Sequence, residues 1–216
     1  LTGLPELERA SIFHALNQKA VARLYAESVG KEYEELNLVV AHMGGGISIG
    51  AHRKGLVVDV NNALDGEGPF SPERVGTLPA LSLAKLCFSG KYTKAEIKKK
   101  LVGKGGAVAY FGTNDIREVL SRAEAGDEAC ATFLKGFCVS VAKYIGALAT
   151  VACGKVDAIV LTGGIAHSAY ITTDIASRVS FIAPVEVYPG ENELESLAEN
   201  GYGILSGEFE IREYLK

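Results

Sequence analysis

The chain has 216 residues, of which 22 are Lys or Arg and 26 are Asp or Glu; its formal net charge is −4 and 48% of it is apolar. This composition is typical of one globular domain, and it excludes both a disordered chain and a generic basic surface for nucleic acid. We therefore expect no nucleic-acid partner. Any phosphate would have to be bound by local features such as loops, Arg, His or Mg²⁺.

The cysteines and the apolar runs point to the cytoplasm. The four cysteines form no Cys-x-x-Cys pair and have no His at metal-ligand spacing, so we expect free thiols, buried as small apolar side chains in a reducing compartment. No apolar run approaches the roughly 20 residues that a membrane span requires. The sequence begins with Leu1 and its single Met is Met43, which we interpret as a piece of a longer protein.

The first part of the chain predicts one helix and three strands. Apolar residues recur every three to four positions over 4–27, as on an amphipathic helix. Three short apolar or alternating runs follow, at 38–43, 47–52 and 56–60. Tight turns between them indicate an antiparallel meander. The next segment, 61–79, is rich in Gly, Pro and Asn, and loops of this length are usually functional or disordered.

The second part alternates helix and strand patterns. Helices are predicted at 79–88, 93–101, 114–125 and 127–153. The continuous apolar run 157–161 is typical of a strand covered on both faces. A helix at 167–178, a strand at 182–188 and a final helix from 191 complete the chain. Gly201, Gly203 and Gly207 should break that last helix. The sum is one α/β domain with a mixed sheet.

Two glycine clusters are the candidate ligand-binding turns. Gly44, Gly45 and Gly46 join the first two strands, and Gly163 and Gly164 join a buried strand to a helix. Glycine lets the main chain approach an anion closely, and a helix N-terminus favours phosphate. Each cluster alone is equally consistent with a simple turn. The P-loop and Rossmann patterns are absent, which leaves the layout of the actin-like, sugar-kinase-like and acetate-kinase-like ATPases.

Four stretches make that resemblance specific. They are RASIFHALNQKAVAR (9–23), LVVAHMGGGISIGAHRKGLVVDVNNALDGEGPFSPER (38–74), VDAIVLTGGIAHS (156–168) and VYPGENELESLA (187–198). In this order they resemble the butyrate kinases of the acetate kinase family, and DGEGPFSPER separates that branch from the acetate kinases. The resemblance implies an RNase H-like (actin-like ATPase) domain, in which helices flank a mixed sheet made of an antiparallel β-meander followed by β/α units.

The resemblance implies transfer of the γ-phosphoryl group of ATP to butanoate, giving butanoyl phosphate and ADP by direct in-line attack, with Mg²⁺ as cofactor. A carboxylic acid is already ionised at pH 7, so the reaction needs positioning and positive charge rather than a general base. Two alternatives stay open. One is a branched-chain or propionate-type acyl kinase, since a pocket distinguishes one methylene by only about 1–3 kcal/mol. The other is a non-catalytic nucleotide-binding module, which would need neither His14 nor Arg74.

Position by position, the resemblance assigns three catalytic residues. His14 would hydrogen-bond the transferring phosphoryl group, and His42 would be a second active-site histidine. Arg74 would hold carboxylate or phosphoryl oxygens, a task that suits its bidentate guanidinium. A lone helical histidine is otherwise usually a satisfied surface or core residue.

The nucleotide and metal residues follow in the same way. Gly44, Gly45 and Gly46 would bind the β and γ phosphates. Asp115 and Arg117 would lie beside the adenosine, whose adenine and ribose would face Gly163, Gly164 and Ile165. Glu193, or Glu191 in a competing alignment, would be the carboxylate near Mg²⁺. Asp115 is also a good helix N-cap, and the two glutamates are equally well explained as first-turn acids.

One family feature, an Asn-x-Gly-Ser-Thr phosphate loop near the N-terminus, is absent from these residues. We therefore expect residues 1–216 to be the C-terminal lobe of a two-lobe kinase, with the final helix returning toward the missing N-terminal lobe. The isolated chain should be inactive. Relatives associate through this lobe, so a homo-oligomer, a dimer or larger, is expected.

Overall fold

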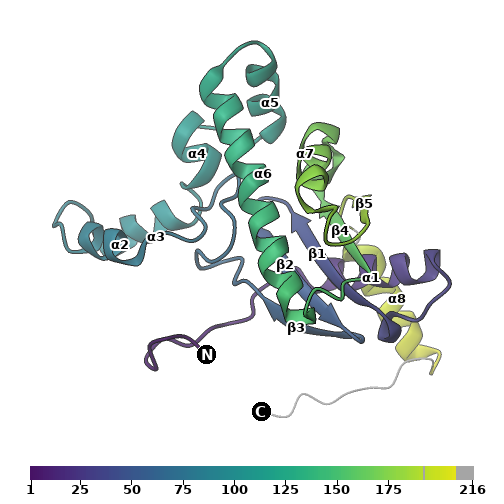
Figure 1. Cartoon of the computed structure of the whole chain (residues 1–216). Coiled ribbons are helices and arrows are strands. Elements are labelled where there is room, and N and C mark those ends of the chain that lie inside the picture. Colours follow the sequence, from purple (N-terminus) through teal and green to yellow (C-terminus); the bar gives the residue numbers. More distant parts are fainter. Residues whose placement is uncertain (192, 208–216) are drawn as a thin grey trace.

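The structure, a computed structural model, describes residues 1–191 and 193–207. Its centre is a five-stranded mixed sheet in the order β3-β2-β1-β4-β5 (Figure 1). The strands are β1 (Asn37–Met43), β2 (Ile47–Arg53), β3 (Leu56–Val60), β4 (Ala158–Gly163) and β5 (Val185–Pro189). The first three form an antiparallel meander, whereas β4 pairs parallel with β1, and β5 parallel with β4. The predicted α/β class, meander and following β/α units are confirmed.

Helices cover both faces of the sheet. They are α1 (Ala15–Ser28), α2 (Ala80–Cys87), α3 (Lys94–Leu101), α4 (Gly106–Phe111), α5 (Ile116–Glu124), α6 (Glu128–Ala149), α7 (Ala169–Val179) and α8 (Glu193–Leu205), with 3₁₀ turns η1 (Tyr33–Glu35), η2 (Thr150–Ala152) and η3 (Gly164–His167). In Figure 1, α6 crosses one face of the sheet and α1 lies on the other with α8, while α2 and α3 project to one side.

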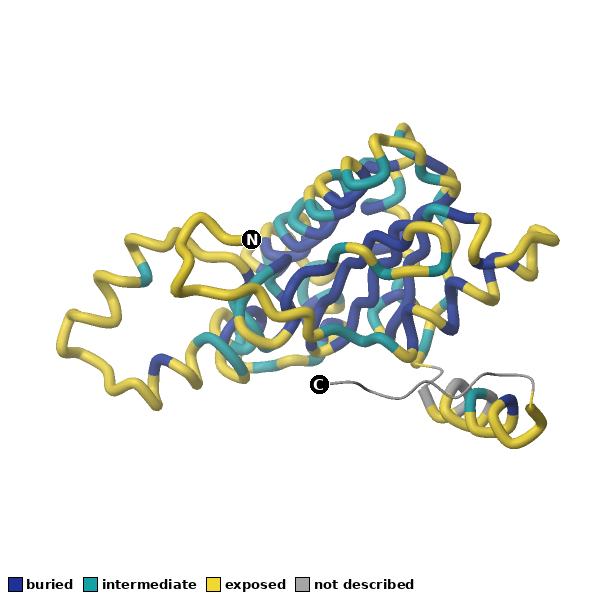
Figure 2. Tube along the Cα trace, turned by 90° about the horizontal axis from the view of Figure 1, so that it is seen from below, coloured by how far each residue is buried: buried dark blue, intermediate teal, exposed yellow. Residues whose placement is uncertain are grey.

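Alternating side chains of β1 and β4 divide the core into two clusters. Val39 and Ala41 face the larger cluster, which the sheet forms with α5, α6 and α7. Leu38 and Val40 face the smaller cluster, built with α1 and η1. Strands buried on both faces explain the continuous apolar runs in the sequence, and Figure 2 shows the central strands in dark blue.

The N-terminal helix prediction was wrong in its first half, because α1 begins only at Ala15. Leu4 and Leu7 have the right spacing but remain 50% and 60% exposed. A helix there would therefore gain no stability from packing of its apolar face. The segment instead runs along the meander, where Arg9 donates to the main-chain oxygen of Val60 at 3.0 Å and pairs with Asp59 at 3.0 Å.

Other differences are smaller. The six-residue helix α4 was not predicted, and β5 begins three residues later than expected. The last helix was expected to break at Gly201 and Gly203, but α8 runs through both and ends at Leu205. Gly207, with φ +76°, follows its end.

The four cysteines are free, as predicted, but only two are buried. Cys130 and Cys138 lie in the core on α6, whereas Cys87 and Cys153 are exposed, contrary to the expectation of burial. By length and composition alone, the segment Glu128–Ala152 would suffice to cross a membrane. Its inward face packs into the larger core cluster, which accounts for its apolar character.

Phe137 of α6 links the core to the loop that carries the predicted site residue Arg74. Its ring is fully buried and lies edge-on to Phe70 of that loop, with the ring centroids 6.1 Å apart. We expect Phe137→Ala to lower the free energy of unfolding by about 3–5 kcal/mol, because truncation leaves a cavity in a packed core.

Urea denaturation followed by far-UV circular dichroism measures this change. The matched control is Phe181→Ala, since Phe181 is 84% exposed and its truncation should cost less than about 0.5 kcal/mol. Equal losses in the two variants would contradict the core role of Phe137.

Candidate active site

The two glycine turns lie at the same edge of the sheet. Strands β1 and β4 are parallel neighbours, with His42 opposite Thr162, so the segments that follow them emerge side by side. Gly163 has φ +87°, and a Cβ placed there would lie 2.4 Å from the main-chain oxygen of Met43. Only glycine therefore allows the end of β4 to approach β1 this closely.

A cavity of about 1030 Å³ opens at this edge. Residues of both glycine turns, the start of α5, the start of α7 and the segment after β5 line it: Gly44, Gly45, Pro72, Asn114, Asp115, Ile116, Arg117, Leu120, Glu124, Gly164, Ile165, His167, Ser168, Ala169, Tyr170 and Glu191. Seven of the residues predicted from the sequence are among them. The other nine were not predicted, among them Asn114, His167 and Tyr170.

Beside Gly44 two histidines stack on each other. His14 immediately precedes α1 and His42 lies near the end of β1; their ring centroids are 3.8 Å apart, with an angle of 12° between the planes. His42 is 1% exposed, and burial, with a smaller effect from His14, lowers its pKa to about 3. Burial and the nearby charge of Arg74 also lower the pKa of His14, while Glu191 opposes the shift. Both rings are therefore neutral near pH 7.

Two neighbouring amides of α1 hold these rings from behind. Asn17 accepts a hydrogen bond from His42 Nδ1 at 2.8 Å. Gln18 donates to the hydroxyl of Ser48 at 2.8 Å, and that hydroxyl lies 2.8 Å from His14 Nδ1. Both amides are fully buried. Neither amide was predicted from the sequence as a site residue.

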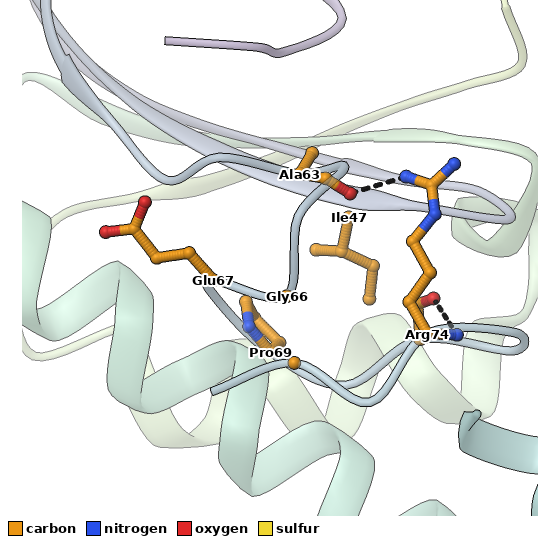
Figure 3. Close-up of a pocket in the computed structure, with 8 residues that line it drawn as sticks. Ile47, Ala63, Gly66, Glu67, Pro69 and Arg74 are labelled. Atoms are coloured by element: carbon orange, nitrogen blue, oxygen red, sulfur yellow. Dashed lines mark hydrogen bonds between the residues drawn. The ribbon is translucent and has the colours of Figure 1, made fainter. Parts of the chain in front are cut away.

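Arg74 lies over the first glycine turn. A Cβ on Gly46 would lie 1.9 Å from Arg74 Nη1, so the guanidinium occupies the space that a side chain would fill. Nη1 donates to the main-chain oxygen of Ala63, and Figure 3 shows this contact beside the apolar side chains of Ile47 and Pro69. Arg74 Nε is buried without a hydrogen-bond partner among the described residues.

Ser71 fixes the loop of Arg74 to the glycine turn. Its hydroxyl donates to the main-chain oxygen of Gly45 at 2.6 Å and accepts from the Arg74 main-chain N–H at 3.1 Å. The loop is thus ordered by direct bonds to the turn that it faces.

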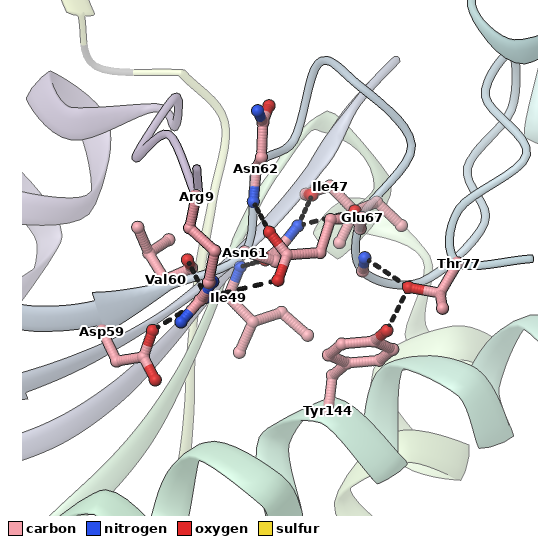
Figure 4. A network of polar contacts seen from close by, with 11 residues as sticks. Arg9, Ile47, Ile49, Asp59, Val60, Asn61, Asn62, Glu67, Thr77 and Tyr144 are labelled. Carbon is pink, nitrogen blue, oxygen red and sulfur yellow. Dashed lines mark hydrogen bonds and ion pairs between the residues drawn. The ribbon is translucent and has the colours of Figure 1, made fainter. Parts of the chain in front are cut away.

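A polar network holds the rest of the segment 61–79 (Figure 4). Asn61 joins it to the main chain of β2 through hydrogen bonds with Ile49 and Ile47. The carboxylate of Glu67 accepts from the Asn62 main-chain N–H at 2.7 Å and pairs with Arg9 at 3.2 Å. These bonds connect the loop to the meander.

The predicted adenosine residues take part in helix capping as well. The Asp115 carboxylate accepts from the Arg117 main-chain N–H at 2.9 Å, which caps α5, and pairs with the Arg117 guanidinium at 2.7 Å. The hydrogen bond from the Arg117 side chain has the largest effect on the Asp115 carboxylate and, with the main-chain bond, lowers its pKa to about 2. The N-cap interpretation is therefore confirmed, while the nucleotide role stays a prediction.

Glu191 faces the same cavity. Its Oε1 lies 3.9 Å from His42 Nε2, and its side chain is 57% exposed. The side chain of Glu193, the first candidate for the carboxylate near Mg²⁺, lies outside the described side chains. The structure thus brings His14, His42, Arg74 and Glu191 together around the first glycine turn, and their roles remain predictions.

Comparison with known proteins identifies relatives of this chain. Probable butyrate kinases of Clostridium botulinum (strain Alaska E43 / Type E3) and Phocaeicola vulgatus are 56% and 57% identical to this chain, covering 99% of it. The crystal structure of Porphyromonas gingivalis acetate kinase matches with a TM-score of 0.85 at 23% identity, over 95% of this chain and 59% of that one. The chain spans 60% of the length of these butyrate kinases.

The fold is therefore that of the RNase H-like, actin-like ATPase domains. Within that class, residues 8–202 match the Acetokinase family, and the chain belongs to it. The family resemblance read from the sequence motifs is confirmed.

The close approach at Gly163 gives a test of the site's architecture. We expect Gly163→Ala to lower the free energy of unfolding by about 2–4 kcal/mol, because the new side chain meets the Met43 main chain and the residue keeps a positive φ. Gly164→Ala is the matched control, since a Cβ there meets nothing within 4 Å. Urea denaturation of both variants measures the difference, and similar losses would contradict the packing described for the end of β4.

The buried histidines predict acid sensitivity. Burial lowers the pKa values of His42 and His52 to about 3, from an ordinary value of 6.5. Both rings stay neutral in the folded state but take up protons on unfolding below pH 6.5, so the free energy of unfolding falls as the pH falls. Each can contribute up to about 1.4 kcal/mol per pH unit between about pH 6 and pH 5.

We therefore expect His52→Gln to reduce that slope by about 1 kcal/mol per pH unit. Urea titrations at a series of pH values measure it. A variant with the slope of the unmodified protein would show that His52 is charged in the fold.

Proposed function

We propose that this chain is the catalytic and nucleotide-binding part of a carboxylate kinase that uses ATP to convert butanoate to butanoyl phosphate. The observation that carries the proposal is the meeting of His14, His42 and Arg74 at one glycine turn, beside a cavity that also includes the second glycine turn. Relatives that are 56% and 57% identical bear the name probable butyrate kinase, which supports the same substrate.

The residues present suit direct transfer between two anions. Main-chain groups of Gly44 and Gly45 line the cavity and can approach phosphate oxygens without steric hindrance. Arg74 supplies positive charge next to them, since its guanidinium lies against Gly46. His14 supplies a neutral imidazole, stacked on the ring of His42 that borders Gly44. Positive charge and positioning are what a phosphoryl transfer to an ionised carboxylate needs.

Mg²⁺ fits this site as a nucleotide-bound ion. The described residues contain no cluster of three His, Cys, Asp or Glu side chains that could hold a metal by themselves. Mg²⁺ is commonly held by one or two carboxylates together with substrate phosphates, and Glu191 is such a carboxylate on the cavity wall. When bound, the ion would neutralise negative charge on the phosphate oxygens.

The setting of the chain is part of the proposal. Because the chain spans 60% of its relatives' length and its sequence has no Asn-x-Gly-Ser-Thr loop, we propose that it is the C-terminal lobe of a two-lobe enzyme and expect the other lobe to complete the site. Butanoate and ATP/ADP are the proposed small-molecule partners. We further propose a cytoplasmic location and assembly as a dimer or larger oligomer.

The function is tested by trapping acyl phosphate with hydroxylamine in the full-length protein that contains this chain. We expect ATP- and butanoate-dependent product, and a decrease of about 10²–10³-fold in each of His14→Ala and Arg74→Ala, because each removes a group that stabilises developing charge.

The matched control is Lys98→Ala, which removes an exposed positive charge from α3 and should leave the rate unchanged. ADP binding without any trapped product in the unmodified protein would favour a non-catalytic nucleotide-binding module. Parallel assays with propanoate and 2-methylpropanoate would show whether a shorter or branched acyl chain is preferred.

A further inference from the structure

The tautomers of the two stacked histidines decide what each can offer a bound phosphate. A neutral imidazole carries its proton on one ring nitrogen and a lone pair on the other. In both rings Nδ1 is engaged by the protein, through Ser48 at His14 and through Asn17 at His42. The two Nε2 atoms have no hydrogen-bond partner among the described residues, and His42 Nε2 faces Gly44 and Glu191 on the cavity wall.

The orientation of the Asn17 amide determines the tautomer of His42. Its Nδ2 donates to the main-chain oxygen of Gly190 at 3.4 Å, and a carbonyl can only accept, so the amide oxygen must point the other way. That oxygen lies 2.8 Å from His42 Nδ1. His42 Nδ1 therefore carries the proton, and its Nε2 presents a lone pair.

The orientation of the Gln18 amide determines the tautomer of His14 in the same way. Its Nε2 donates to the main-chain oxygen of Ser48 at 3.1 Å, which again can only accept, and also to the Ser48 hydroxyl at 2.8 Å. The main-chain N–H of His14 donates to that hydroxyl as well, at 3.4 Å. Both lone pairs of the hydroxyl are then used, so its proton goes to His14 Nδ1 and the proton of the His14 ring is on Nε2.

Two further buried groups complete this chain of hydrogen bonds. The Gln18 oxygen lies 3.0 Å from His52 Nε2, which must therefore donate, and His52 Nδ1 accepts from the Tyr33 hydroxyl at 2.7 Å. Burial raises the pKa of Tyr33 to about 12, so the phenol keeps its proton. Every bond from Tyr33 to His14 then runs in one direction, with each donor and acceptor matched.

We propose that the adjacent amides Asn17 and Gln18 are positioning residues that hold the two stacked histidines in opposite tautomers, so that His14 presents an Nε2–H donor and His42 an Nε2 lone pair. The identity of the groups that these two atoms would bind rests on the proposed function. The donor on His14 suits an oxygen of the transferring phosphoryl group, which gains charge during transfer. The lone pair on His42 cannot bond an unprotonated phosphate oxygen and instead suits a hydrogen donor such as an ordered water.

The test is ¹⁵N NMR of the full-length protein labelled with ¹⁵N-histidine, since protonated and unprotonated imidazole nitrogens resonate far apart. Loss of signals in His14→Gln and His42→Gln assigns each ring. We expect the proton on Nε2 of His14 and on Nδ1 of His42 near pH 7.5. The same tautomer at both rings of the unmodified protein would overturn the proposal.

Two variants distinguish the effect of Gln18 from that of Asn17. Gln18→Met should convert His14 to a mixture of tautomers and leave His42 unchanged, whereas Asn17→Leu should do the reverse. Each variant is the folding control for the other, because the unaffected ring reports an intact site. A folded Gln18→Met protein whose His14 proton stays entirely on Nε2 would contradict the proposal.

Kinetics supply a second readout. In Gln18→Met we expect kcat for acyl phosphate formation to fall about two- to tenfold, with KM for ATP changed less than about twofold, because only the protonation pattern of one donor changes. An unchanged kcat in a variant with mixed His14 tautomers would contradict the donor role. The spectra do not depend on turnover, so opposite tautomers in a protein that forms no acyl phosphate would refute the proposed function alone.

Discussion

The parallel pairing of β1 with β4 is the constraint on which the candidate site depends. It directs the segments after both strands to one edge of the sheet, and Gly163 lets them approach until main chain meets main chain. Had β4 been antiparallel to β1, the two glycine turns would lie at opposite ends of the domain. The cavity between them follows from strand direction and one missing side chain.

In a protein of net negative charge, anion binding at this site would depend on local groups. His42 is buried, His14 is half-buried and both are neutral, so Arg74 is the cation placed against the first glycine turn. Its loop is held on one side by the packing of Phe70 against α6 and on the other by the hydroxyl of Ser71. Placement of this charge therefore depends on the hydrophobic core as much as on the site.

The sequence predicted the parts of the fold that short-range patterns encode. The apolar runs of β1 to β4 and the glycine-rich turns between them located the meander and the strand beside it. The helix expected over 4–27 was wrong in its first half because burial, not spacing, decides where a helix begins. The candidate residues from His14 to Arg74 came from family resemblance. Asn17 and Gln18 could not have been selected, since their significance lies in main-chain carbonyls at Gly190 and Ser48, distant in the chain.

The projecting segment of α2 and α3 is less buried than the rest of the domain. No residue of α2 is buried, and Ile97 is the buried residue of α3. This arm therefore contributes few side chains to the hydrophobic core of the domain. Cys87, the last residue of α2, is exposed and offers a thiol for attaching a fluorophore or spin label there.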